Sequence, residues 1–318
     1  MKINVFGAGA IGGFLAAALS RAGHEIGVVA RGEHLQAIRG SGHIRVSQSD
    51  LGAFEARVHA AGDLRELPAA QYVLLTFKSH QWDGVLEQLQ PGIASGAALV
   101  TLQNGLPFWL DEHRPIEAVD PGGTLLRSIP RDSVIGGVVH ASGHIVFPGV
   151  IHQSGGMLYP LGELDGAASQ RVEQLSQAFV DAGMQAPVQP QIRKNIWLKV
   201  INNAALNPVS ALTRARMHAM LADTEVRSVL AAIITEGISV ARATGIELGV
   251  TAEQRLEWAG RLADVKTSML QDLEAGKRLE LEPICGAVVD VARQHDVQVP
   301  TLQNVYALTK LLQQVNQA

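Results

Sequence analysis

The sequence predicts an α/β amino-terminal domain followed by an all-α carboxyl-terminal domain. Its 318 residues are long for one hydrophobic core, which favours two domains. In the first half, short β-type runs alternate with helical patterns, as in a parallel sheet covered by helices. After Pro187 and Pro190 only helical patterns remain, so we expect one domain over 1–189 and a second over 190–318.

The expected elements follow from the period of the hydrophobic residues. Strands of the first domain are expected at 2–6, 25–30, 72–76, 97–102 and near 184–188. Its helices are expected at 10–22, 80–89 and 168–182. Short runs separated by glycines and Pro148 predict an antiparallel meander over 134–162. Helices of the second domain are expected at 192–206, 224–244, 251–275, 282–295 and 301–313.

Composition and charge exclude several classes of protein. Hydrophobic residues make up 47% and charged residues 18%, as in a globular chain. The net charge is -4 and no basic stripe is present, so we expect no nucleic-acid partner. The single cysteine, Cys285, excludes an intrachain disulfide, and no Cys/His cluster has metal-site spacing. No apolar stretch reaches the roughly 20 residues of a membrane helix and the amino terminus lacks signal-peptide features, so we expect a cytoplasmic protein without a membrane partner.

A glycine-rich motif follows the first expected strand and opens the first expected helix. Gly7 permits a tight turn, Gly9 lets backbone amides approach a pyrophosphate, and Gly12 lets helix and strand pack closely. The positive end of the helix dipole then faces the phosphates. This context predicts a Rossmann-like dinucleotide-binding domain. The expected cofactor-binding residues of the motif are Gly7, Ala8, Gly9, Ala10, Ile11 and Gly12.

The end of the second expected strand favours NADP(H) over NAD. NAD-binding proteins usually place an acidic residue there for the ribose 2′-hydroxyl. This sequence has Val28-Val29-Ala30-Arg31-Gly32 and no acid. The Arg31 guanidinium matches the geometry of a 2′-phosphate. The alternative is that Arg31 is an ordinary solvated loop residue.

Three polar residues are spaced four residues apart in the helix expected at 192–206 and just beyond it. Lys199, Asn203 and Asn207 share one helix face, and apolar neighbours indicate that the helix is largely buried. Buried polar groups are costly without partners, and a substrate could be one. Ketone reduction needs a proton donor, which a lysine ammonium can be without any metal. Alternatively, Lys199 extends to water and the asparagines cap loops, and spacing alone leaves both interpretations open.

With these motifs, the chain resembles the ketopantoate reductase family over essentially its whole length. The resemblance implies a Rossmann-like domain, an all-helical domain and an active site between them. It implies that Lys199 is the general acid and that Asn203 and Asn207 contact the substrate.

A second stretch carries the same resemblance. The segment Ser268-Met269-Leu270-Gln271-Asp272 is followed by Glu280, twelve residues after the serine, as in the family. The resemblance implies that Ser268 hydrogen-bonds the substrate carboxylate. It also implies that Glu280 orients or tunes Lys199 and contacts the substrate.

Two further residues follow expected strands of the first domain. Lys78 and Asn104 both come at carboxyl ends of parallel strands, where ligands bind in such sheets. The resemblance implies that Lys78 lies near the cofactor and that Asn104 lies where cofactor and substrate meet. The alternatives are a surface lysine and an Asn-Gly turn.

The resulting hypothesis is NADPH-dependent reduction of a small 2-oxo acid, first of all 2-dehydropantoate to pantoate. Two departures from the family pattern leave the substrate open: Glu282 replaces the usual aspartate and Cys285 replaces a common asparagine. One alternative is a relative of the D-2-hydroxyacid dehydrogenases with another 2-oxo acid. Another is a non-catalytic NADP-binding sensor. A homodimer through the helical domain is compatible with the sequence.

Overall fold

The computed structural model describes residues 1–261 and 264–317, which form two compact units. The first unit consists of Met1–Gln103 and Arg127–Ile192, and the second of Asn104–Leu126 and Arg193–Ala318. The chain therefore passes into the second unit at Asn104, returns to the first, and leaves it again after Ile192. The single boundary that Pro187 and Pro190 predict does not account for the first of these crossings, at Asn104.

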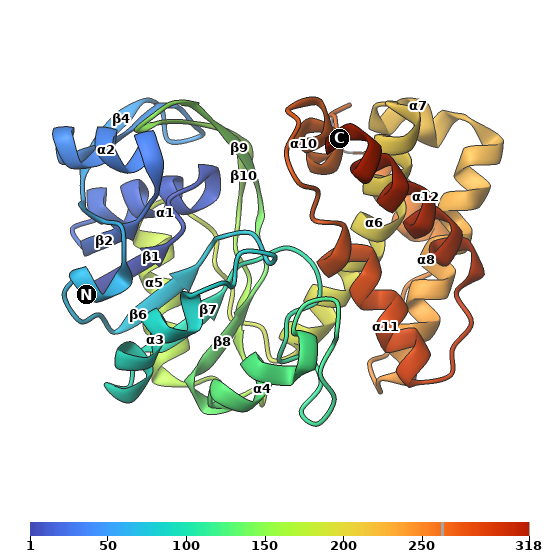
Figure 1. Ribbon diagram of the computed structural model, residues 1–318, viewed down its shortest axis with the longest axis horizontal. Helices are drawn as coiled ribbons and strands as arrows, with labels where there is room; N and C mark the ends of the chain where they lie inside the picture. The colour runs from blue at the N-terminus through green and yellow to red at the C-terminus, as the bar shows by residue number, and fades with distance from the viewer. Residues whose placement is uncertain (262–263, 318) are drawn as a thin grey trace. The chain divides into compact units, whose positions relative to one another are not determined.

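A seven-stranded sheet forms the framework of the first unit (Figure 1). Its order is β11-β8-β7-β6-β1-β2-β5, and all neighbours are parallel except β11, which runs antiparallel to β8. β6 and β7 are buried along their whole length, as expected of parallel strands covered on both faces. The strands are β1 (Lys2–Phe6), β2 (Glu25–Val29), β5 (His59–Ala61), β6 (Tyr72–Leu75), β7 (Ala98–Thr101), β8 (Val134–Gly137) and β11 (Leu161–Glu163).

A second sheet has the order β4-β3-β10-β9. Its strands are β3 (His43–Gln48), β4 (Phe54–Arg57), β9 (His140–Phe147) and β10 (Val150–Leu158). The predicted meander is correct for the antiparallel β9–β10 pair. It is wrong for β8, which joins the large sheet, and it missed that β10 pairs in parallel with β3. Strand partners about a hundred residues apart leave no local pattern in the sequence.

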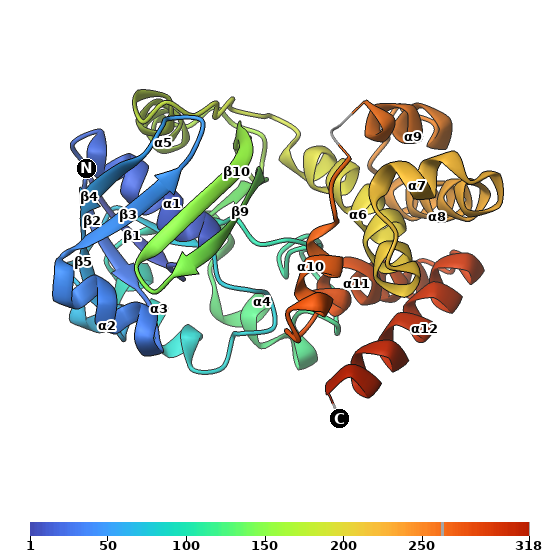
Figure 2. The same cartoon turned by 90° about the horizontal axis from the view of Figure 1, so that it is seen from above.

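Helix α1 (Ala10–Arg21) packs against both sheets of the first unit, which Figure 2 shows from above. Every residue from Gly12 to Leu19 is buried, so the helix is apolar on all sides. A Cβ on Gly13 would lie 2.1 Å from Ile151 Cδ1 of β10, so glycine is required for this close approach. The apolar amino-terminal segment therefore forms part of the core of the first unit.

The remaining helices of this unit are shorter. They are α2 (Gly32–Ser41), α3 (Val85–Ala94) and α5 (Gln170–Asp181), while α4 (Thr124–Ser128) spans the division between the units. α3 begins five residues later than predicted, because Gly84 is its N-cap in a left-handed conformation with φ of +68°.

The described residues of the second unit form helices and no strand, as predicted. Gly237 of α8 packs against Ile201 of α6, where a Cβ would lie 2.8 Å from Ile201 Cγ2. The helix predicted over 251–275 is two helices, and residues 262 and 263 of it lie outside the described chain. The helices are α6 (Ile192–Thr213), α7 (Met217–Ala222), α8 (Thr224–Ala243), α9 (Ala252–Gly260), α10 (Ser268–Glu274), the π-helical turn η4 (Glu282–Gly286), α11 (Ala287–Gln294) and α12 (Pro300–Gln317).

Across the described residues, no helix combines the length and apolar character needed to cross a membrane.

Candidate active site

The glycine-rich turn joins β1 to α1 and is anchored to β2. Gly7 N and Ala8 N both donate to Val29 O, at 3.1 and 2.9 Å, and Gly13 N donates to Gly9 O at 2.7 Å. Gly9 is the N-cap of α1 and has no side chain to cap the first amides of the helix. The start of α1 therefore presents backbone donors and the positive end of a helix dipole, which suit an anion.

The three glycines of the motif have different surroundings. A Cβ on Gly7, whose φ is +106°, would lie 2.7 Å from Phe77 N, and one on Gly12 would lie 2.2 Å from Gly7 O. Packing thus requires glycine at both positions. A Cβ on Gly9 would meet no protein atom within 4 Å, so the space beside this glycine is open to a ligand. The turn fits the approach of a dinucleotide pyrophosphate.

Arg31 and Lys78 lie at the same edge of the sheet as this turn. Arg31 follows β2, is exposed, and is the N-cap of α2. Lys78 follows β6, in a turn where its backbone N–H donates to Gln81 Oε1 at 3.2 Å. Because β2 and β6 flank β1 in parallel, their carboxyl ends place both cationic residues beside the glycine-rich turn. All the residues predicted to bind the cofactor, apart from Asn104, belong to this edge.

Within the second unit, a chain of hydrogen bonds joins three predicted residues. The Lys199 ammonium donates to Asn104 Oδ1 at 2.5 Å, and Asn104 Nδ2 donates to Glu280 Oε2 at 3.1 Å. These residues are 95 and 176 positions apart in the sequence. The asparagine amide thus orients both the cation and the carboxylate.

The electrostatics of this group make Lys199 a suitable proton donor. Burial lowers the pKa of the Lys199 ammonium from 10.5 to about 8, and the negative charge of Glu280 partly opposes the shift. A pKa of about 8 leaves the ammonium mostly protonated near pH 7, yet makes it a stronger acid than an ordinary lysine. The group combines a proton donor with an amide and a carboxylate that hold it.

The loop that carries Asn104 is fixed by the π-helical turn η4. Leu106 N donates to Pro283 O at 2.9 Å. That carbonyl is available because the Ala287 amide bonds Glu282 O in the π-turn. Gly105 has φ of +92°, and a Cβ there would lie 2.3 Å from Pro283 O. The short distance from Glu280 to Pro283 along the chain explains why the same turn positions both Glu280 and Asn104.

The other predicted substrate contacts are not joined to this group by any hydrogen bond within the described chain. Asn203 and Asn207 follow Lys199 along α6 at the predicted spacing. Asn207 is 5% exposed and its Nδ2 has no hydrogen-bond partner in the structure. Ser268 is exposed and is the first residue of α10.

Sequence reasoning missed two residues that hold the sites. Thr76, at the end of β6, donates its hydroxyl to Gly7 O at 2.8 Å and so braces the glycine-rich turn. Pro283 supplies the carbonyl that binds the Asn104 loop. Thr76 had a signal, since it directly precedes Phe77-Lys78 at a strand end. The role of the Pro283 carbonyl leaves no signal in the sequence, because every residue has such a backbone group.

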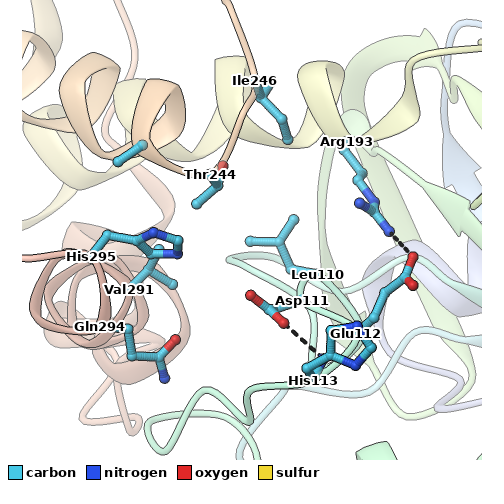
Figure 3. A pocket seen from close by; sticks show the side chains of 11 residues that line it. Leu110, Asp111, Glu112, His113, Arg193, Thr244, Ile246, Val291, Gln294 and His295 are labelled. Carbon is cyan, nitrogen blue, oxygen red and sulfur yellow. Dashed lines mark hydrogen bonds and ion pairs between the residues drawn. The ribbon is translucent and has the colours of Figure 1, made fainter.

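A separate cavity of about 260 Å³ lies in the second unit (Figure 3). Its wall includes Leu110 and Val291, together with Arg193, whose guanidinium pairs with Glu112 at 3.2 Å. Lys199, Asn104 and Glu280 do not line it. Among residues 1–261 and 264–317, no group of three or more His, Cys, Asp or Glu side chains is placed to hold a metal ion.

Comparison with known proteins identifies the family. The model of the family "Ketopantoate reductase PanE/ApbA" matches residues 3–166, and the model of its C-terminal domain matches residues 191–313. The chain belongs to the ketopantoate reductase family. It is an oxidoreductase of the class that acts on a CH–OH group.

Individual relatives agree over the whole chain. A 2-dehydropantoate 2-reductase of Mesorhizobium japonicum is 38% identical, covering 98% of each chain. The solved structure of a Ralstonia solanacearum protein assigned to the ketopantoate reductases has a TM-score of 0.92 at 32% identity, covering 99% of this chain and 98% of that one. A D-mandelate dehydrogenase bound to NADH and anilino(oxo)acetate shares the fold, with a TM-score of 0.86 at 20% identity and 100% coverage of both chains.

Both departures from the usual ketopantoate reductase pattern have structural partners. The Cys285 thiol is fully buried and lies 3.9 Å from Ala204 O, a carbonyl that loses its helical donor because Pro208 has no N–H. Burial raises the pKa of this thiol, which makes it a poor nucleophile. The Glu282 carboxylate accepts from Tyr306 OH at 2.7 Å and pairs with Lys310 at 3.6 Å. The side chains are thus used in packing the helical unit.

Proposed function

We propose that this protein reduces 2-dehydropantoate to pantoate with NADPH. The observation that carries the proposal is the hydrogen-bonded group of Lys199, Asn104 and Glu280, in which burial tunes the pKa of the lysine to about 8. The family assignment supplies the substrate class, since relatives across the whole chain are 2-dehydropantoate 2-reductases.

The proposed chemistry uses Lys199 as the general acid. Bound NADPH supplies the hydride to the ketone carbon. The Lys199 ammonium hydrogen-bonds the carbonyl oxygen, stabilises the negative charge that develops on it, and transfers its proton there. Asn104 holds the ammonium in place, and the Glu280 carboxylate keeps the lysine protonated at neutral pH. A proton from solvent then restores the ammonium.

The proposed cofactor site is the edge of the large sheet. The first amides of α1 would bind the pyrophosphate, and Gly9 leaves room for it. Arg31 would bind the 2′-phosphate that distinguishes NADPH from NADH, because it is exposed and no acidic residue ends β2. Lys78 adds a second positive charge at the same edge.

The proposed substrate contacts are Asn203, Asn207 and Ser268. Asn207 supports this role because its buried Nδ2 has no partner among the residues that the structure describes, and leaving such a donor unpaired costs about 1–3 kcal/mol. A substrate oxygen would supply the missing acceptor. Ser268 is exposed, and its hydroxyl would donate to the substrate carboxylate.

The decisive experiment measures NADPH oxidation with 2-dehydropantoate and a panel of other 2-oxo acids, for the wild-type protein and Lys199→Ala. We expect 2-dehydropantoate to give the highest kcat/KM. We expect Lys199→Ala to lose on the order of a hundredfold or more in kcat, the usual effect of removing a general acid. A different preferred acid would refute the substrate, near-normal turnover of the variant would refute the proton donor, and absence of turnover despite NADPH binding would favour a sensor.

A further inference from the structure

We propose that His34 is a positioning residue of the dinucleotide site, which fixes the start of α2, and with it Arg31, relative to the glycine-rich turn. The inference deepens the proposed function, since it assumes that Arg31 and the turn bind one NADPH molecule. The proposal rests on two hydrogen bonds that the His34 ring makes within the first unit.

The two ring nitrogens of His34 have different partners. Nε2 lies 2.7 Å from Ala8 O, inside the glycine-rich motif. Nδ1 lies 3.0 Å from the backbone N of Gly149, in the turn between β9 and β10. A carbonyl oxygen only accepts and a backbone N–H only donates, so Nε2 must carry the proton and Nδ1 must accept. Both bonds exist together only in the neutral ring with the proton on Nε2.

Each segment that His34 joins is itself anchored. Ala8 N is bonded to Val29 O at 2.9 Å, which ties the turn to the end of β2. Gly149 O accepts from Arg45 N at 3.0 Å, which ties the hairpin turn to β3. Gly149 also lies against α2, where a Cβ would be 3.4 Å from the Ala37 Cβ. His34 therefore links α2 to two fixed points rather than to mobile side chains.

His34 controls Arg31 through the first turn of α2. Arg31 is the N-cap of this helix, and Leu35 N donates to Arg31 O at 3.2 Å, so both residues belong to one hydrogen-bonded turn. Arg31 has no acidic partner among the ion pairs of the first unit that the structure describes. Its backbone position is thus set by α2, and α2 is held to the pyrophosphate turn by His34. A single ribose joins the 2′-phosphate to the pyrophosphate of NADPH and limits their spacing, so a loose α2 would cost binding energy.

The environment of the ring supports the neutral form. Burial lowers the pKa of His34, and its hydrogen bond to Ala8 opposes this shift. A neutral imidazole is what the bond from Gly149 requires.

The test measures the Kd of NADPH and NADH by fluorescence titration, and kcat at saturating cofactor, for the wild-type protein and several variants. We expect His34→Ala to raise the Kd of NADPH about tenfold, from the loss of one or two hydrogen bonds, with kcat within about twofold of wild type. His34→Gln, whose amide retains a donor and an acceptor, should restore part of the affinity. The matched control is His24→Ala, because His24 is also half-buried in the first unit but bonds the amino-terminal amine, at 3.3 Å.

A double-mutant cycle separates positioning from general stabilisation. If His34 acts through Arg31, the combined loss of NADPH affinity in His34→Ala/Arg31→Ala should be smaller than the product of the single losses. A fully multiplicative loss, or equal losses for NADPH and NADH in His34→Ala, would overturn the proposal. So would an unchanged Kd in that variant.

A measurement on the wild-type protein covers the case in which His34→Ala does not fold. Nitrogen-15 NMR of the imidazole at pH 7 should show a neutral ring with the proton on Nε2, and a proton on Nδ1 would reject the inference. Failure of the proposed function looks different: wild-type protein that binds NADH better than NADPH would refute the role of Arg31. In that case the inference about His34 would fall together with the role of Arg31, whatever the Kd values of His34→Ala.

Discussion

At the scale of single residues, the chemistry depends on how burial tunes one lysine. Lys199 lies beside an amide and a carboxylate, and its pKa is about 8 because desolvation outweighs the attraction of Glu280. An ordinary surface lysine stays protonated up to a pH of about 10.4. The acidity that suits Lys199 to donate a proton therefore comes from its surroundings.

The first prediction concerns the pH dependence of catalysis. Since Lys199 must be protonated to act as the acid, kcat/KM should fall above a pH of about 8. Removing the negative charge with Glu280→Gln should move this fall to lower pH, because that charge raises the pKa of the lysine. The control is Glu282→Gln, which removes a carboxylate that bonds Tyr306 and not Asn104. Steady-state kinetics from pH 6 to 10 test this, and an unshifted profile for Glu280→Gln would contradict it.

The second prediction concerns cofactor choice. Arg31→Ala should raise the KM for NADPH on the order of ten- to a hundredfold, since a charge-assisted bidentate contact is lost. The KM for NADH should change little. Arg57→Ala removes an exposed arginine from β4 and serves as the charge control. Equal effects of Arg31→Ala on both cofactors would argue against a 2′-phosphate contact.

At the scale of elements, the loop that follows β7 depends on one glycine. Gly105 combines a positive φ with direct contact to η4, and its neighbour Asn104 binds both Lys199 and Glu280. The contact with the π-helical turn thus fixes the loop that places Asn104 between Lys199 and Glu280. Such turns are rare and frequently occur at functional sites.

The third prediction tests this loop. Gly105→Ala should lower the free energy of unfolding by about 1–3 kcal/mol from backbone strain and lower kcat as well, because Asn104 is displaced. The matched control is Gly122→Ala in the same segment, where φ is also positive at +69° but a Cβ would meet no atom within 4 Å. Urea denaturation and kinetics measure the two effects. A loss of kcat in both variants would show that strain alone is responsible.

At the scale of the whole molecule, the buried lysine opposes stability. The native pKa of Lys199 is about 8 and the unfolded value is 10.5, so below pH 8 the native state bears the full cost of a buried charge. As pH rises from about 8 to 10.5, the unfolded state holds more protons at this group than the native state does. Stability from this group therefore increases with pH over that window.

The fourth prediction follows from this linkage. The free energy of unfolding of the wild-type protein, relative to Lys199→Met, should rise by on the order of 2 kcal/mol between pH 8 and 10.5. Urea denaturation at several pH values measures the difference. A difference that stays constant over the window would mean that the lysine titrates normally in the folded state.

The fifth prediction concerns assembly. A homodimer through the helical domain, with which the sequence is compatible, should give in light scattering twice the 33.8 kDa mass of one chain. A mass of one chain across the micromolar range would contradict it.

Much of the molecule could be predicted because its signals are local. The glycine motif requires Gly7 and Gly12 for contacts within one strand–turn–helix unit, and the spacing of Lys199, Asn203 and Asn207 follows from the period of a single helix. The absence of an acid after β2 is also visible in a few residues. These features depend on backbone geometry that neighbouring residues determine.

Tertiary structure decided what depends on distant partners. The second sheet pairs β3 with β10, and no residue near either strand specifies that partner. The bond from Lys199 to Asn104, the pKa that results from burial, and the link from His34 to Ala8 and Gly149 likewise join segments far apart in the chain. The sequence determined the fold class, the family and the candidate residues, whereas the packing of distant segments decided which side chains touch and how strongly each one holds its proton.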